Sequence, residues 1–450
     1  MTKKLPEEIY QNEELQLTAV HLDASNNRMK EMPKELSNMK HLESINLKNN
    51  KFEKLPEGVK SLLDLKFLDV SDNNLRTLPT NIYKLKHLSE LKVSNNALKS
   101  VSIKSDATKK LKSVDFSHNK IKKLKMSIYK IPQCINLSHN NLEELPAVNL
   151  KTTSVKILNM SHNRLQSLPM GIENLQRLTT LNISDNRVTK IPDELGKLKH
   201  LRILDLSKNS LTFLPESFCD ISSSLYEICL DRNNIISLPN NINKFSNLKS
   251  FRASCNKIIK LPDTFSALPS LEYVDLSVNE LVDIEPLMNL KSCKFINISE
   301  NSVKQLSENL YNLSSLCYFN ASCNKLTHLP DAICFLINLK YLNVSKNVIK
   351  MMPAEFGLRQ LLEYLNASNN LLADVPDSIK LMASLKHFDI SDNMIERIPD
   401  SIIRCKKLKY LNISDNKLAN YPDIFHTIRQ KVEIVYGLQS TEKVKMFKTH

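Results

Sequence analysis

Three histidines are the clearest candidates for acid–base or metal chemistry in this sequence. His118, His139 and His162 follow one another at intervals of 21 and 23 residues. Histidines on neighbouring strands can share a metal ion or respond to pH near neutrality. No carboxylate or thiolate stands beside them at the same place of the pattern, and Asp185 only follows them. We therefore expect a solvated surface row, and we predict no metal ion and no cofactor.

The nine cysteines offer little for nucleophilic catalysis. They are scattered, form no C-x-x-C pair and have no histidine base placed to activate them. The motifs H-E-x-x-H and G-x-S-x-G and a Walker phosphate loop are all missing, and the chain has only five glycines. The sequence therefore predicts a protein that is not an enzyme.

A column of aromatic residues is the best candidate for a binding site. Seven successive copies of a repeated pattern carry an aromatic ring at one strand position: Tyr273, Phe295, Tyr318, Tyr341, Tyr364, His387 and Tyr410. On strands about 4.8 Å apart, these rings would form a stripe on the order of 30 Å long. Tyrosine offers contact area and a hydrogen-bonding tip, which suits a protein partner. Cross-strand stacking that only stabilises the sheet is the other interpretation, and both remain open at this point.

The elements that position these residues come from one repeated pattern. An asparagine marks each copy, and fourteen of the seventeen intervals between these asparagines are 23 residues. The eighteen positions are Asn27, Asn50, Asn73, Asn96, Asn119, Asn140, Asn163, Asn186, Asn209, Asn233, Asn256, Asn279, Asn301, Asn324, Asn347, Asn370, Asn393 and Asn416. Each copy reads approximately L-x-x-L-x-L-x-x-N-x-L-x-x-L-P-x-x-I-x-x-L-x-x.

This pattern matches the leucine-rich repeat. The L-x-L step has the period of a strand, and the following proline cannot continue a central sheet. We therefore predict an α/β solenoid: a leucine-rich repeat horseshoe with a parallel concave sheet and about 18 repeats of 23 residues. Residues 1–18 should form an N-terminal cap or partial repeat, 19–422 the solenoid, and 423–450 a C-terminal cap and mobile tail.

The net charge of +14 suggests a second surface. Lysines crowd two repeats at Lys104, Lys109, Lys110, Lys112, Lys120, Lys122, Lys123 and Lys125. Such a patch could bind an acidic protein, an anionic membrane or another polyanion, and this peripheral binder is the alternative function. The patch lacks interleaved aromatic residues for base stacking, so nucleic acid is not expected as a partner.

The cysteines and the first residues of the chain indicate a cellular compartment. The start of the chain lacks the apolar core of a signal peptide, and the cysteine count is odd. Nowhere do 18 uncharged apolar residues run together, so no membrane span is expected. These features predict a reducing compartment, either the cytoplasm or the nucleus.

The repeat also resembles a narrower group. The stretch "LPEGVKSLLDLKFLDVSDNNLRTLPTNIYKLKHL", from Leu55 to Leu88, is similar to the Ras-group intracellular leucine-rich repeat proteins of the Shoc-2/Sur-8-like class. The resemblance implies a cytoplasmic scaffold in signal transduction, with a small GTPase or a phosphatase among its protein partners. The segment "KSVDF", Lys112 to Phe116, fits a phosphatase-docking pattern, but Val114 and Phe116 occupy core positions of a repeat strand.

Overall fold

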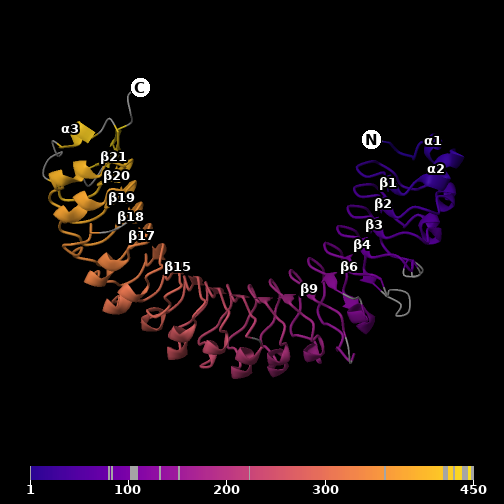
Figure 1. Ribbon diagram of the computed structural model, residues 1–450, viewed down its shortest axis with the longest axis horizontal. Helices are drawn as coiled ribbons and strands as arrows, with labels where there is room; N and C mark the ends of the chain where they lie inside the picture. The colour runs from indigo at the N-terminus through magenta and orange to yellow at the C-terminus, as the bar shows by residue number, and fades with distance from the viewer. Residues whose placement is uncertain are drawn as a thin grey trace. The chain divides into compact units, whose positions relative to one another are not determined.

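The computed structural model describes residues 2–79, 82, 85–101, 110–130, 133–150, 153–221, 223–358, 361–418, 424–428, 431–437 and 444–446. The chain divides into two compact units. The N-terminal unit comprises Met1–Leu211 and Asp220–Leu225, and the C-terminal unit comprises Thr212–Cys219 and Tyr226–His450. In both units, three-residue strands line one side and short helical turns line the other (Figure 1).

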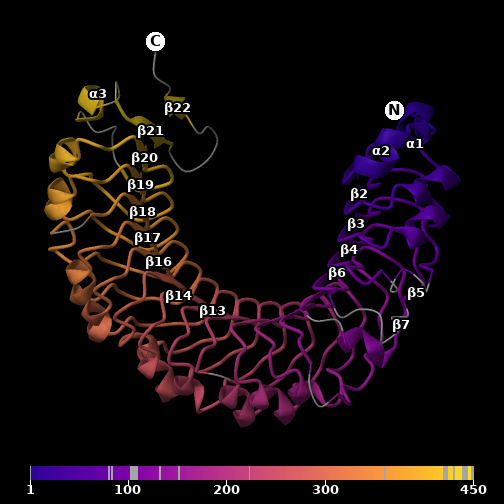
Figure 2. The ribbon, with the colours of Figure 1, turned by 45° about the vertical axis from the view of Figure 1, so that its right-hand side comes forward.

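The N-terminal unit contains a sheet of parallel strands that follow one another along the chain. The strands are β1 (His21–Asp23), β2 (Ser44–Asn46), β3 (Phe67–Asp69), β4 (Glu90–Lys92), β6 (Ser113–Asp115), β8 (Cys134–Asn136), β9 (Ile157–Asn159), β10 (Thr180–Asn182) and β11 (Ile203–Asp205). Each residue pairs with its counterpart one repeat later, as Leu181 does with Leu204. A separate parallel pair, β5 (Ser100–Val101) and β7 (Lys123–Leu124), lies apart from β4 and β6 (Figure 2).

Short helices connect these strands. The N-terminal unit has α1 (Glu7–Gln11), α2 (Glu13–Thr18), η1 (Lys34–Asn38), η2 (Glu57–Ser61), η4 (Met126–Lys130), η5 (Ile172–Asn174) and η6 (Asp193–Lys197), while η7 (Glu216–Asp220) spans the boundary between the units in the sequence. Leu5 is buried, and the backbone N–H of Thr2 donates to Oδ1 of Asn27 at 2.7 Å. The residues before β1 therefore supply the first repeat asparagine with a hydrogen-bond donor.

The C-terminal unit repeats the same plan. Its parallel strands are β12 (Glu227–Cys229), β13 (Ser250–Arg252), β14 (Tyr273–Asp275), β15 (Phe295–Asn297), β16 (Tyr318–Asn320), β17 (Tyr341–Asn343), β18 (Tyr364–Asn366), β19 (His387–Asp389), β20 (Tyr410–Asn412) and β21 (Glu433–Tyr436). The predicted fold class, a repeat solenoid built on a parallel sheet, is confirmed.

The helices of the C-terminal unit are also short. They are η8 (Ile242–Lys244), η9 (Asp263–Ala267), η10 (Glu285–Leu287), η11 (Glu308–Asn312), η12 (Asp331–Phe335), η13 (Asp377–Leu381), η14 (Asp400–Arg404) and α3 (Ile424–Ile428). Phe425 of α3 and Ile434 of β21 are buried, so both contribute to the end of the core. After residue 437, the structure describes only β22 (Val444–Met446), which pairs antiparallel with β21.

The repeat asparagines connect their own repeat to the preceding one by hydrogen bonds, as Asn347 illustrates. Asn347, which is buried, donates from Nδ2 to the carbonyl oxygens of Ala321, Val344 and Ser345 at 3.0–3.2 Å. Its Oδ1 accepts a hydrogen bond at 2.9 Å from the backbone N–H of Leu326. The side chain thereby satisfies backbone groups that the turn leaves without partners, which explains why the sequence uses an amide at this place.

The residue before each of these asparagines has a left-handed backbone. Its φ lies between 51° and 56° in all eighteen repeats. Asparagine and aspartate adopt this conformation more easily than other residues with a side chain, and they occupy eight of the eighteen positions. The histidines of the candidate row, His118, His139 and His162, stand at this same turn position.

Val278 is the one β-branched residue among these eighteen, and its φ is 56°. Because β-branched side chains clash with the backbone in this conformation, Val278→Asn should stabilise the C-terminal unit by about 1 kcal/mol. Val278 is partly exposed, so little packing is lost in the exchange. Urea denaturation followed by circular dichroism measures the change. The reciprocal control, Asn369→Val, should lose a similar amount, and an unchanged midpoint for both variants contradicts the strain argument.

Candidate protein-binding surface

The seven predicted aromatic residues occupy the first position of seven consecutive strands, β14 to β20. Strand pairing places each ring directly beside the next: Tyr273 beside Phe295, Phe295 beside Tyr318, and so on to Tyr410. The middle residues of these strands are buried, so the residues on either side of them face outward. The structure therefore brings all seven into one row, which we call the aromatic stripe.

The rings of the aromatic stripe stack face to face. Centroids of consecutive rings lie 4.2–4.4 Å apart, and their planes deviate from parallel by 4–9°. All seven residues are half-buried, because each ring is covered by its neighbours. Ring edges and hydroxyl groups are what the stripe presents to a partner. At one end, the guanidinium of Arg252 lies 4.9 Å from the ring centroid of Tyr273.

A row of charged residues runs along one side of the stripe. These residues directly precede the strands, and Glu272 bridges Lys249 at 3.0 Å and Lys294 at 2.7 Å. Further along the row, Lys386 pairs with Glu363 at 2.5 Å. These ion pairs neutralise part of the row, which keeps a net positive charge because it also contains Lys340 and Lys409.

A row of amides and carboxylates runs along the other side, at the third position of each strand. Their side chains accept hydrogen bonds from the serines two residues later. Oδ1 of Asn320, for example, accepts from the backbone N–H and the hydroxyl of Ser322 at 3.1 and 2.8 Å. Asp275 binds Ser277 in the same way. The side chains of this row are therefore held by hydrogen bonds within the turns. The rings of the stripe, which lie between the two rows, are held mainly by stacking.

The titratable groups of the stripe are neutral at physiological pH. Burial, the largest cause, raises the pKa of the Tyr318, Tyr341 and Tyr364 hydroxyls above the ordinary value. Burial also lowers the pKa of His387, although the carboxylate of Asp389 opposes that shift. A row of neutral rings with intact hydroxyl groups can both donate and accept hydrogen bonds at a protein interface.

The histidine row forms a second stack, in the N-terminal unit. Ring centroids of His118 and His139 are 4.0 Å apart, those of His139 and His162 are 3.9 Å apart, and both pairs are within 11° of parallel. Nδ1 of His162 lies 2.7 Å from Oδ2 of Asp185. The nitrogen lone pairs of parallel rings point in parallel directions, so they do not converge on one metal ion. Among the described residues, no group of three or more His, Cys, Asp and Glu could hold a metal ion.

His139 should make stability depend on pH. Burial first, and then the charges of His118 and His162, lower its pKa below 6.5, while Asp185 acts in the opposite direction. The unfolded chain therefore takes up a proton here before the folded chain does, and stability falls as pH drops below about 6.5. His139→Asn, which suits the left-handed turn, should reduce the fall between pH 7.5 and 5.5. Urea midpoints measured across that range test this, and curves that stay parallel contradict it.

The predicted lysine patch is described at six of its eight positions. Lys104 and Lys109 lie outside the described residues. Lys110 and Lys112 precede β6, whereas the other four follow it: Lys120, Lys122, Lys123 and Lys125. All six described lysines are exposed, and Lys123 lies 3.9 Å from Glu144. The described lysines therefore stand both before and after β6 in the chain, and a common binding surface for them stays a prediction.

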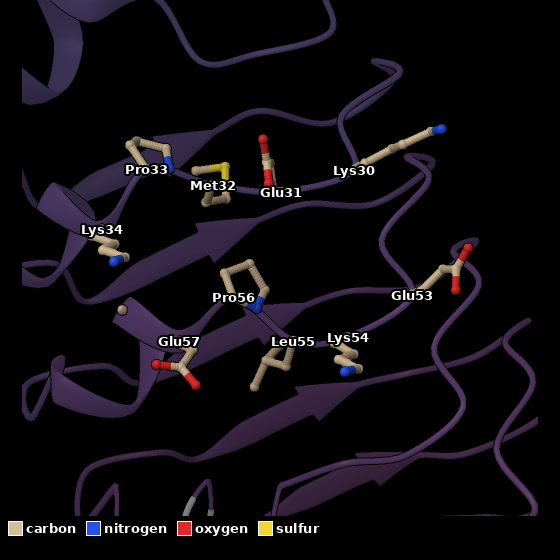
Figure 3. Close-up of a pocket in the computed structure, with 11 residues that line it drawn as sticks. Lys30, Glu31, Met32, Pro33, Lys34, Glu53, Lys54, Leu55, Pro56 and Glu57 are labelled. Atoms are coloured by element: carbon tan, nitrogen blue, oxygen red, sulfur yellow. The ribbon is translucent and has the colours of Figure 1, made fainter.

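Two hollows of the N-terminal unit arise from the repeat itself. One, of about 390 Å³, lies between the segments Lys30–Lys34 and Glu53–Gly58 and carries both lysines and glutamates (Figure 3). The other, of about 530 Å³, is lined by asparagines of the turns together with Lys48 and Asp72, which are 3.6 Å apart. Neither has a uniform charge, and neither excludes water from a reactive group.

Comparison with known proteins agrees with this geometry. Leucine rich repeat families match residues 133–188, 176–224, 360–418 and 64–85. This chain folds as a leucine-rich repeat solenoid. A leucine-rich repeat protein of Leptospira interrogans is 26% identical, with a TM-score of 0.64 over 96% of this chain and 93% of that one. A comparison of the sequence with curated proteins gives no match.

Two further leucine-rich repeat structures show the same fold at lower identity. YopM from Yersinia enterocolitica is 24% identical, with a TM-score of 0.65 over 94% of this chain and 88% of that one. The plant peptide hormone receptor RGFR1, in complex with RGF2, is 21% identical, with a TM-score of 0.74 over 96% of this chain and 77% of that one. No helix in the described part of the solenoid is long and apolar enough to cross a membrane.

The solenoid buries the segment that fits the phosphatase-docking pattern. Val114 and Phe116 are 1% and 0% exposed, since they are core residues of the repeat that contains β6. A docking partner could reach them only after the repeat had unfolded. This segment therefore provides no accessible phosphatase site in the folded solenoid.

Sequence reasoning missed two features that border the aromatic stripe. Arg252, which contacts the first ring, comes from a different column of the repeat than the rings do. The bridge of Glu272 to Lys249 and Lys294 also escaped notice. The sequence did contain a signal for this bridge, because the position before each strand carries lysine, glutamate and lysine in three successive repeats. Residues one repeat apart lie side by side on leucine-rich repeat strands, so these charges must meet.

Proposed function

We propose that this chain is a non-enzymatic scaffold that binds a protein partner through the strand face of its C-terminal unit. The aromatic stripe supports this proposal most strongly. Seven neutral, half-buried rings in an unbroken row combine apolar area with hydroxyl groups, which is the chemistry of an interface core. The family resemblance adds an interaction role in the cytoplasm, and the cysteine pattern is compatible with the nucleus as well.

The competing interpretation gives the stripe only a structural role. Stacked cross-strand pairs contribute up to about 1 kcal/mol each to sheet stability. A purely structural stripe requires no run of hydroxyl groups, since phenylalanine stacks as well. Five of the seven residues are tyrosines, and a polar tip at the solvent edge favours recognition.

A triple variant tests the proposal. Tyr318, Tyr341 and Tyr364 are all changed to alanine, and the recovery of cellular partners by affinity purification is compared with wild type. We expect at least about a tenfold loss of specific partners, because central aromatic residues dominate binding energy. A matched control changes Tyr311, Phe335 and Ile337, which are at least half exposed on the helical side of the same unit, to alanine.

Two outcomes separate recognition from stability. Changing the same three tyrosines to phenylalanine preserves stacking and removes the hydroxyl groups, so partial loss of binding shows that the hydroxyls are recognised. Partner recovery that is unchanged in the alanine variant, despite a lower melting temperature, assigns the stripe to the structural role and rejects the proposal.

The resemblance to Ras-group proteins narrows the choice of partner to a Ras-type small GTPase or an assembly that includes a phosphatase. Purified Ras-type GTPases loaded with GTP or GDP analogues can be tested directly for binding. Nucleotide-dependent binding to wild type that the alanine variant loses supports this identity. If neither nucleotide state binds, a Ras-type GTPase is excluded as the partner. The scaffold proposal is then tested by the purification experiment alone.

A further inference from the structure

A third hollow, in the N-terminal unit, differs from the other two in its charge. It has a volume of about 440 Å³ and lies where the chain enters β9, β10 and β11. Four of its lining residues carry a permanent positive charge: Lys156, Arg177, Lys199 and Arg202. Its lining contains no aspartate and no glutamate. We call it the basic hollow.

Three of these cations lack a counter-charge among the described residues. In the part of the chain that the structure describes, Lys156, Arg177 and Arg202 form no ion pair. Lys199 differs, because its Nζ donates to the carbonyl oxygens of Gly196 and Asp220. Cations left together without a counter-ion repel one another, so an anion that enters the basic hollow gains favourable interactions with all of them.

The same column of the repeat behaves differently in the C-terminal unit. The position before each strand also carries lysines there, but Glu272 contacts two of them and Glu363 a third. In the basic hollow, Thr179 occupies the place between Lys156 and Arg202 where a glutamate would neutralise them. Three successive repeats without a carboxylate in this column, at positions 156, 179 and 202, therefore distinguish the basic hollow from the repeats around Glu272 and Glu363.

The donor groups favour a phosphate over a carboxylate. Two guanidinium groups can each donate a pair of parallel hydrogen bonds to phosphate oxygens. The hydroxyl of Thr179 already donates to the carbonyl oxygen of Lys156 at 3.0 Å, so the donors offered to a ligand come from the charged side chains. A phosphate monoester carries close to two negative charges at neutral pH and matches this cluster better than a single carboxylate does.

Apolar residues beside the basic hollow favour a peptide as the carrier of that phosphate. Ile157 and Ile203 begin β9 and β11, next to Lys156 and Arg202, and are 41% and 38% exposed. An extended peptide that crosses the strands can place apolar side chains on these isoleucines while its phosphate enters the hollow. We propose that the basic hollow binds a phosphoserine- or phosphothreonine-containing segment of a protein partner. The proposal uses no residue of the aromatic stripe.

Two labelled peptide libraries test this with the full chain. Both have degenerate flanking positions, and they differ only in a central phosphoserine or serine. Fluorescence anisotropy should show that the phosphorylated library binds at least about tenfold more tightly. The double variant Arg177→Ala with Arg202→Ala should abolish that preference. Arg177→Lys with Arg202→Lys should retain part of it, because lysine keeps the charge but not the paired hydrogen bonds.

The controls distinguish the basic hollow from general basicity and from the stripe. Lys120→Ala with Lys122→Ala removes two exposed lysines of the same unit and should leave the preference intact. The triple tyrosine variant should also keep it, so failure of one proposal does not imply failure of the other. Circular dichroism confirms that each variant is folded. If the variant Arg177→Ala with Arg202→Ala does not fold, the variant Arg177→Lys with Arg202→Lys serves as the readout.

Three results overturn the proposal. The first is equal affinity for the two libraries. The second is an equal loss in the control variant Lys120→Ala with Lys122→Ala, which assigns binding to overall charge. The third is binding to phosphatidylserine vesicles that depends on Arg177 and Arg202 while the libraries show no preference, which assigns the hollow to a lipid surface.

Discussion

Asn347→Leu is expected to destabilise the C-terminal unit by roughly 3–5 kcal/mol. Leucine has the same number of side-chain heavy atoms and the same branching as asparagine, although its methyl groups occupy more volume than the amide does. The four hydrogen bonds of the amide disappear, however, and the backbone groups of Ala321, Leu326 and Val344 lose a buried partner. Because water cannot reach these groups, most of their desolvation is left uncompensated.

Urea denaturation of wild type and variant measures this loss. A matched control in the same repeat is Asn343→Leu, which removes an amide whose Oδ1 accepts from the backbone N–H of Ser345 at 3.1 Å. Asn343 is only partly buried, so its loss should cost about 1 kcal/mol. Equal effects of the two substitutions contradict the view that the buried amides hold the solenoid together.

Gly357→Ala should destabilise the C-terminal unit by about 3 kcal/mol or more. A Cβ atom at this position would lie 1.8 Å from the carbonyl oxygen and 2.5 Å from the carbonyl carbon of Ser378. These are backbone atoms of η13 in the next repeat, so no side-chain rotation relieves the clash. The N–H of Gly357 also donates to the hydroxyl of Ser378 at 3.2 Å, and that hydrogen bond would be strained as the backbones separate.

Gly58→Ala provides the comparison for this prediction. There the nearest atoms are the Ser37 nitrogen at 3.1 Å and the Leu36 Cβ at 3.2 Å, so a shift of a few tenths of an ångström accommodates the methyl group. We expect Gly357→Ala to be far less stable than Gly58→Ala. Calorimetry or urea denaturation measures the difference. Similar stabilities for both variants show that the contact between Gly357 and η13 is not tight.

Periodicity predicted the parts of the fold that depend on hydrophobic burial. The L-x-L step placed Leu342 inside and Tyr341 beside it on the outward side, and strand pairing then aligned Tyr341 with Tyr318 and Tyr364. An aromatic residue one repeat from another must lie next to it on a parallel sheet in register. The order of the aromatic stripe therefore followed from spacing alone.

Features that depend on backbone geometry were not predictable in the same way. The position of the left-handed turn residue is often asparagine or aspartate, which indicates such a turn. Val278 and Cys323 occupy the same position in other repeats and obscure that pattern. The closeness of Gly357 to Ser378 depends on how tightly two return segments pack, which no spacing rule specifies. The basic hollow draws Lys156 and Arg177 from different columns of the repeat, so a search for runs of lysine found residues 104–125 instead.

The most direct test of the central claim places a photo-crosslinker on the aromatic stripe in living cells. Benzoylphenylalanine replaces Tyr341 in one version of the chain and Phe335, on the helical side of the same unit, in another. We expect discrete crosslinked proteins from position 341, the same ones that the triple tyrosine variant fails to recover, and none of them from position 335. Identical adducts from both positions, or adducts from position 335 alone, would contradict a partner-binding role for the strand face.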